Sequence, residues 1–152
     1  MDGQDKKPGA VWQILLVKAE AASKLAQLRL KKASARKNEV LNQISKLDNL
    51  LAEYRTAHSK MAENTHDTFL VANYRQFVSQ LEGIKAQAAA SLIACETDFE
   101  IARQNLRSVD TERIKMESLV LKASEARKIS AEYAEAKSIE TENLIRHNMS
   151  HL

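Results

Sequence analysis

The chain has 152 residues, a formal net charge of +3, and compositions of 44% hydrophobic and 28% charged residues. This length and balance are typical of one folded domain rather than a disordered chain. With three Phe, three Tyr and one Trp, the sequence lacks the bulky side chains that fill a thick globular core. We therefore expect a thin, elongated core.

Turn-forming residues are almost absent after the first ten positions. The glycines are Gly3, Gly9 and Gly83, and Pro8 is the only proline. A chain without turn formers, rich in Ala, Leu, Lys and Glu, favours very long helices. We expect an all-α protein, with residues 1–10 disordered and residues 147–152 a frayed tail.

Two heptad seams, with apolar residues alternately three and four apart, predict two helices. The first series predicts a helix over about 11–62, and the second predicts one over about 68–146. The seam positions are Trp12, Leu16, Ala19, Ser23, Ala26, Leu30, Ala33, Lys37, Val40, Ile44, Leu47, Leu51, Tyr54, His58 and Met61, then Tyr74, Val78, Leu81, Lys85, Ala88, Leu92, Cys95, Phe99, Ala102, Leu106, Val109, Arg113, Met116, Val120 and Ala123.

The direction of the second helix depends on the stretch between the seams. "ENTHDT", at residues 63–68, is dense in capping and turn-forming side chains and predicts a turn at about 63–67. If the chain reverses there, facing residues have numbers with a constant sum, and Leu47 with Leu81 and Val40 with Ala88 both give 128. We therefore predict an antiparallel two-helix coiled coil, a helical hairpin spanning 11–146, whose C-terminal helix overhangs its partner.

An alternative architecture stays open at this stage. Because the turn stretch contains no glycine, one helix of roughly 135 residues in a parallel dimer is also compatible with the heptads. The overhang still has an apolar stripe, which includes Leu119, Ala126 and Tyr133. A stripe without an intramolecular mate indicates contact with another protein, although a solvated tail is the simpler alternative.

Positive charge is concentrated near the N-terminus. Residues 1–37 hold nine Lys or Arg against three acids, with a cluster in "RLKKASARK" at 29–37. This cluster is either a solvated helix face or a binding site for an acidic protein, an anionic membrane or nucleic acid. Nucleic acid is the least favoured of these, because stacking aromatics are missing.

Sequence signals for catalysis are lacking. The chain has no glycine-rich phosphate loop, no HExxH motif and no Cys or His ligand cluster, and the single Cys95 can form no intramolecular disulfide. No stretch approaches the roughly 20 apolar residues of a membrane span. We expect a protein of a reducing compartment that is not an enzyme and uses no cofactor or metal.

One stretch resembles a known family. "NYRQF" at 73–77, followed by Leu81 and Glu82 and preceded by "LLAEYR" at 50–55, resembles the FliJ family of flagellar type III export proteins. The resemblance implies a cytoplasmic stalk-like coiled coil, peripherally associated with the inner-membrane export apparatus. Its implied partners are the hexameric export ATPase, the cytosolic domain of the membrane export-gate protein, and export chaperones, with no nucleic acid and no small-molecule substrate.

The resemblance also implies site residues. Carried over residue by residue, the gate-binding patch is Gln43, Leu47, Leu50, Tyr54, Phe77, Leu81, Ile84 and Ala88. Gln43, Leu50, Phe77 and Ile84 fall off the seams, and we expect them to form one strip with Phe77 as its anchor, unless Phe77 is buried between the helices. We expect the ATPase ring to contact the basic cluster and the overhang, at Arg29, Lys31, Lys32, Arg36, Lys37, Leu119, Ala126 and Tyr133.

Two other functions remain open from the sequence. The equivalent stalk of a virulence-type secretion system would share this fold and mechanism. A general coiled-coil scaffold or peripheral membrane binder would instead use the basic N-terminal helix.

Overall fold

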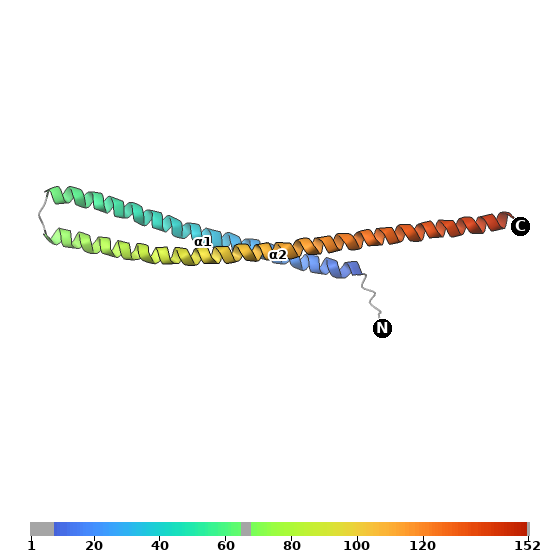
Figure 1. Cartoon of the computed structure of the whole chain (residues 1–152). Coiled ribbons are helices and arrows are strands. Elements are labelled where there is room, and N and C mark those ends of the chain that lie inside the picture. Colours follow the sequence, from blue (N-terminus) through green and yellow to red (C-terminus); the bar gives the residue numbers. More distant parts are fainter. Residues whose placement is uncertain (1–7, 65–67, 152) are drawn as a thin grey trace. The chain divides into compact units, whose positions relative to one another are not determined.

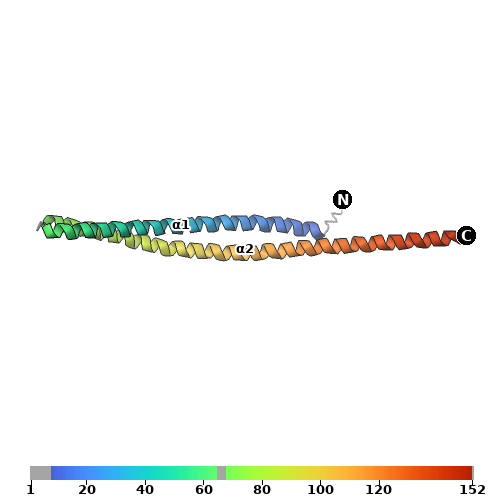
Figure 2. The ribbon, with the colours of Figure 1, turned by 90° about the horizontal axis from the view of Figure 1, so that it is seen from above.

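The fold consists of two α-helices in the computed structural model, which describes residues 8–64 and 68–151. α1 (Pro8–Asn64) and α2 (Thr68–Ser150) make up this part of the chain, and no strand occurs within it. The helices pack against each other in opposite directions (Figure 1, Figure 2). This confirms the predicted all-α fold, an antiparallel two-helix coiled coil.

The helices extend further than the sequence pattern predicted. α1 begins at Pro8 rather than near residue 11, because proline's fixed φ suits the first helical position and its missing N–H has no helical partner there. α2 continues to Ser150 rather than ending near residue 146, so residues 147–150 are helical. Residues 1–7, 65–67 and 152 lie outside the described residues, and what was predicted for the N-terminus and the turn stays a prediction.

The chain divides into two compact units. The terminal unit comprises Met1–Lys24 and Arg107–Leu152, and the central unit comprises Leu25–Leu106. In each, a segment of α1 packs on a segment of α2. Neither helix interior contains proline, and the one interior glycine of α2, Gly83, is exposed.

The core of the central unit is thin and follows the predicted seams. Ala26, Leu51 and Leu81 are buried. The other seam residues, from 26 to 51 in α1 and from 74 to 106 in α2, are buried or half-buried. Only the last seam positions of α1 depart, with Tyr54 and Met61 exposed. The seams were therefore predicted correctly over most of their length.

The register of the two helices differs from the predicted one. Side-chain contacts in the central unit join Asp48 to Lys85, Tyr54 to Phe77, and His58 to Tyr74. The numbers of these pairs sum to between 131 and 133, not to 128. The reason is the length of the connection: α1 ends at Asn64 and α2 begins at Thr68, and these numbers sum to 132.

The terminal unit contains the start of α1 and the whole overhang. Ser23, on the seam, is buried, and its hydroxyl donates a hydrogen bond of 2.6 Å to Oδ1 of Asp110. Half-buried residues of α2 continue as far as Ala123, and every residue from 124 to 150 is exposed. The predicted C-terminal overhang is thus a solvated continuation of α2.

Candidate interaction surfaces

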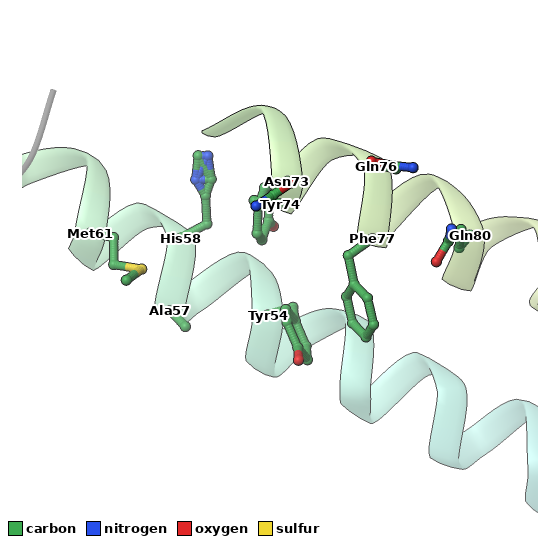
Figure 3. Close-up of a pocket in the computed structure, with 9 residues that line it drawn as sticks. All are labelled: Tyr54, Ala57, His58, Met61, Asn73, Tyr74, Gln76, Phe77 and Gln80. Carbon is green, nitrogen blue, oxygen red and sulfur yellow. The ribbon is translucent and has the colours of Figure 1, made fainter. Parts of the chain in front are cut away.

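An open groove lies on one edge of the seam in the central unit (Figure 3). Its volume is about 480 Å³. The residues that line it are Tyr54, Ala57, His58, Met61, Asn73, Tyr74, Gln76, Phe77 and Gln80. The last turns of α1 and the first turns of α2 therefore form one surface, to which both helices contribute.

Two aromatic contacts across the helices build this groove. The rings of Tyr54 and Phe77 have centroids 4.5 Å apart and an interplanar angle of 36°. The His58 ring meets Tyr74 edge-on, with centroids 3.8 Å apart. Tyr54 is 36% exposed and Phe77 37%, so neither ring is enclosed by the helices. Rings held in place yet open to solvent provide contact area with few rotatable bonds left to order.

The opposite edge of the seam has a different chemical character. There, Nζ of Lys85 lies 2.5 Å from Oδ1 of Asp48, and the Arg55 guanidinium lies 3.2 Å from Glu82. On this edge, charged side chains of α1 therefore pair with charged side chains of α2. Since the pairs are largely exposed, each contributes little to stability. The aromatic edge is therefore the one left available for apolar contact.

The structure separates the predicted gate-binding residues into three groups. Leu81 is buried, whereas Leu47, Leu50 and Ala88 are half-buried between the helices. Tyr54 and Phe77 line the groove, and Gln43 and Ile84 are exposed.

The altered register changes which of these residues meet. Phe77 was expected to form a strip with Leu50, but its aromatic partner is Tyr54, four residues further along α1. A helical rise of 1.5 Å per residue makes this a shift of about 6 Å along α1. Phe77 is not enclosed between the helices, so the alternative in which it is a core residue does not describe the structure.

Several groove residues were not predicted from the sequence. Ala57 and Met61 continue the row of Tyr54 along α1 at helical spacing, and Asn73 and Gln80 flank Phe77 on α2 in the same way. Extending the predicted patch by i, i+3 and i, i+4 steps toward the turn would have identified them.

The basic residues predicted to contact the ATPase ring lie on the α1 segment of the central unit. Arg29, Lys31, Lys32 and Arg36 are exposed. Lys37 is half-buried, with its ammonium 5.0 Å from the centre of the Phe99 ring, where it makes a cation–π contact.

The other predicted ring contacts lie in the terminal unit. Leu119 is half-buried, whereas Ala126 and Tyr133 lie on the exposed overhang. The basic cluster thus belongs to the central unit and the overhang to the terminal unit.

A polar network lies in the terminal unit, a few residues before the overhang begins. Asp110, which accepts the Ser23 hydrogen bond, lies 3.5 Å from Nε of Arg113. The Arg113 guanidinium also contacts Glu117 at 2.5 Å, and this carboxylate raises the pKa of Arg113. Arg113 is therefore a permanent cation on the seam, held by acids on both sides.

No group of three His, Cys, Asp or Glu side chains in 8–64 or 68–151 is arranged to hold a metal ion. Within the same ranges, neither helix has the length and apolarity needed to cross a bilayer.

The fold defines an antiparallel two-helix coiled-coil protein with exposed aromatic and basic surfaces. Comparison with family sequence models gives its membership: the model described as flagellar FliJ protein matches residues 13–139, and the chain belongs to this family. It is therefore a flagellar, type III export-related protein, as the "NYRQF" stretch predicted. No curated protein and no solved structure matches the chain.

Proposed function

We propose that this protein is a stalk-like component of the flagellar export apparatus that engages the export ATPase ring, the export gate and export chaperones. The observation that carries the proposal is the family match over residues 13–139. Because the match is to a flagellar protein, it favours the flagellar over the virulence-type system. The protein would act in the cytoplasm, peripherally associated with the membrane-embedded export machinery.

The proposed roles follow from the character of each surface. The groove with Tyr54 and Phe77, together with Ile84 and Gln43 farther along the same edge, would receive the cytosolic domain of the gate protein. The overhang, with Tyr133, would enter the ATPase ring, and the basic cluster of α1 would contact acidic groups of that ring. Because the same coiled coil would bind both the ATPase ring and the gate protein, it would couple ATP hydrolysis to activation of the gate.

A stalk must be extended and stiff, and the seam between the two helices is suited to this. It consists of many small layers, among them Ala26, Leu51 and Leu81, rather than one globular core. The interaction is thus distributed along both helices, and exposed surfaces at separate places remain free for different partners.

The test is the activity of the cognate export ATPase with and without this protein. A variant that ends after Arg127 lacks most of the exposed overhang and retains every half-buried residue of the seam. We expect the full chain to stimulate ATP hydrolysis and the truncated chain to lose that stimulation while it still binds the gate domain. Normal stimulation by the truncated chain would show that the overhang is not the ring-binding element.

A matched control keeps the length of the chain and alters an exposed apolar side chain elsewhere. Ile101→Ser in α2 removes a side chain that is exposed and lies outside the groove and the overhang. It should stimulate as the unchanged protein does. If the unchanged protein does not stimulate although its helicity is intact, a general scaffold becomes the better description.

A further inference from the structure

The side of α1 that faces away from α2 carries an apolar row that the fold does not use. In the terminal unit, Ile14 is half exposed and Val17 is 61% exposed. In the central unit, Leu25 and Leu28 are each about half exposed. Ile14 and Leu28 each lie two residues from the seam positions on both sides, which places them about 200° around the helix from the seam, and Val17 and Leu25 lie next to them on the helix surface. The row therefore lies opposite the seam.

Cations flank this row on both sides. Between residues 8 and 38, Glu20 is the only acid, against seven Lys or Arg. Six of these cations are exposed: Lys18, Lys24, Arg29, Lys31, Lys32 and Arg36. At 100° per residue, Lys24 and Lys31 project on one side of the apolar row, Lys18, Arg29 and Arg36 project on the other, and Lys32 projects within the row at the angle of Ile14. We call the four apolar residues and these six cations the outer face of α1.

Within the described residues none of these six cations forms an ion pair, whereas Arg103, Arg113 and Arg146 on α2 each pair with a nearby glutamate. Their charge is therefore available to an external anion. The outer face has both apolar and cationic residues in the terminal unit, and it has both in the central unit.

We propose that the outer face of α1 binds the surface of an anionic phospholipid bilayer. A helix with an apolar row between two rows of cations lies flat in the bilayer interface, where apolar side chains enter the acyl boundary and cations meet lipid phosphates. A second copy of the chain fits this face poorly, since two such faces would bring like charges together. An acidic protein would satisfy the cations but gives no role to the apolar row.

This inference does not depend on the proposed function. Arg29, Lys31, Lys32 and Arg36 are also proposed ring contacts, so the ring and the bilayer would compete for these cations. The proposed ring contacts, in contrast, include none of the four apolar residues. Substitutions in that row therefore separate the two proposals.

The experiment is flotation of the full chain with vesicles of phosphatidylcholine alone, and with vesicles that also contain phosphatidylglycerol. We expect binding to the anionic vesicles that is at least about tenfold tighter than to the neutral ones and that weakens with added salt. The paired substitution Leu25→Ser with Leu28→Ser, and separately Lys31→Gln with Lys32→Gln, should each weaken binding about tenfold or more.

A matched pair on α2 provides the control. Ile93→Ser with Ile101→Ser changes two residues that are more exposed than Leu25 and Leu28 but lie on the other helix, and it should leave vesicle binding unchanged. Circular dichroism confirms that each variant is folded. The Leu25→Ser, Leu28→Ser variant should still stimulate the ATPase if the unchanged protein does.

Three outcomes would overturn the proposal. One is the absence of vesicle binding by the folded chain, and another is equal binding to neutral and anionic vesicles. The third is unchanged binding of the Leu25→Ser, Leu28→Ser variant, which would show that charge alone attracts the chain, as an acidic protein would.

Discussion

Single residues in this coiled coil matter according to what surrounds them, as its two described glycines illustrate. Gly9, in the first turn of α1, is buried, and a Cβ added there would overlap the guanidinium of Arg127. Gly83, in α2, is exposed, and a Cβ there would meet nothing within 4 Å. The close approach of the Arg127 guanidinium explains why residue 9 is a glycine, whereas packing around residue 83 does not require one.

Gly83→Ala should therefore stabilise the protein. Alanine lowers the conformational entropy of the unfolded chain and is favoured over glycine in a helix interior by about 1 kcal/mol. We expect a gain of roughly 0.5–1 kcal/mol in the free energy of unfolding, measured by urea denaturation. A loss of stability would mean that the helix at residue 83 departs from regular geometry. Gly9→Ala is the comparison, in which the gain should be offset by displacement of Arg127.

Phe77 should be more important for binding than for folding. It is 37% exposed and packs on Tyr54, so Phe77→Ala removes an aromatic anchor and only part of a buried contact. We expect affinity for the cytosolic gate domain to fall by at least about tenfold, measured by isothermal titration calorimetry. The free energy of unfolding should fall by only about 1–2 kcal/mol.

The control for Phe77 is Ile101→Ala, which removes an exposed apolar side chain away from the groove. It should bind the gate domain as the unchanged protein does. Equal losses of affinity in both variants would mean that the effect is not local to the groove.

At the scale of elements, α2 has two parts with different sources of stability. Up to Ala123 it is held by the seam, whereas every residue from 124 to 150 is exposed. An isolated helical segment of that length is held mainly by its own backbone hydrogen bonds and by pairs such as Arg146 with Glu142, 3.2 Å apart. The overhang therefore adds helical length without adding core.

Truncation after Arg127 should for this reason leave the seam almost as stable as before. We expect the thermal unfolding midpoint, followed by circular dichroism, to change by no more than about 2–4 °C, because the deletion removes less than about 1 kcal/mol of tertiary stabilisation. The helical signal of the folded protein should fall with the number of residues removed. A large drop in the midpoint would show that the overhang packs on another part of the chain or on a second copy.

At the scale of the whole molecule, the register decides which residues meet. With a sum of 132, each seam position of α1 between residues 12 and 58 lies opposite a seam position of α2, such as Leu51 opposite Leu81. With the predicted sum of 128, only every second position does so. Leu47 then faces Leu81, but Leu51 faces Phe77, which is off the seam. Full pairing of the two seams favours the observed register.

Cross-linking tests this register and the antiparallel hairpin together. In a Cys95→Ser background, Leu51→Cys with Leu81→Cys should form an intramolecular disulfide that migrates as a monomer on non-reducing gels. Leu47→Cys with Leu81→Cys should cross-link more slowly, because an offset of four residues adds about 6 Å along the helix and approaches the limit for a disulfide. A dimeric product would support parallel pairing of two chains, and faster reaction of the second pair would support the sum of 128.

The sequence by itself determined long helices, their seams and the family, because a heptad pattern and a lack of turn formers predict a coiled coil. The antiparallel hairpin and its overhang needed the structure, since a parallel dimer fits the same heptads. The sequence also indicated Tyr54 and Phe77, since "LLAEYR" and "NYRQF" lie on either side of the turn. A heptad seam repeats when one helix slides along the other by seven residues, so periodicity alone does not fix the register, although full pairing favours a sum of 132 over 128. Tertiary structure decided it through the short connection between Asn64 and Thr68.

The two edges of the seam are likewise equivalent in the heptad pattern. Only packing placed the ion pair of Asp48 and Lys85 on one edge and the rings of Tyr54 and Phe77 on the other. The physical reason is that a periodic sequence specifies which face of each helix is buried. The contacts across the seam depend in addition on the axial register of the second helix relative to the first.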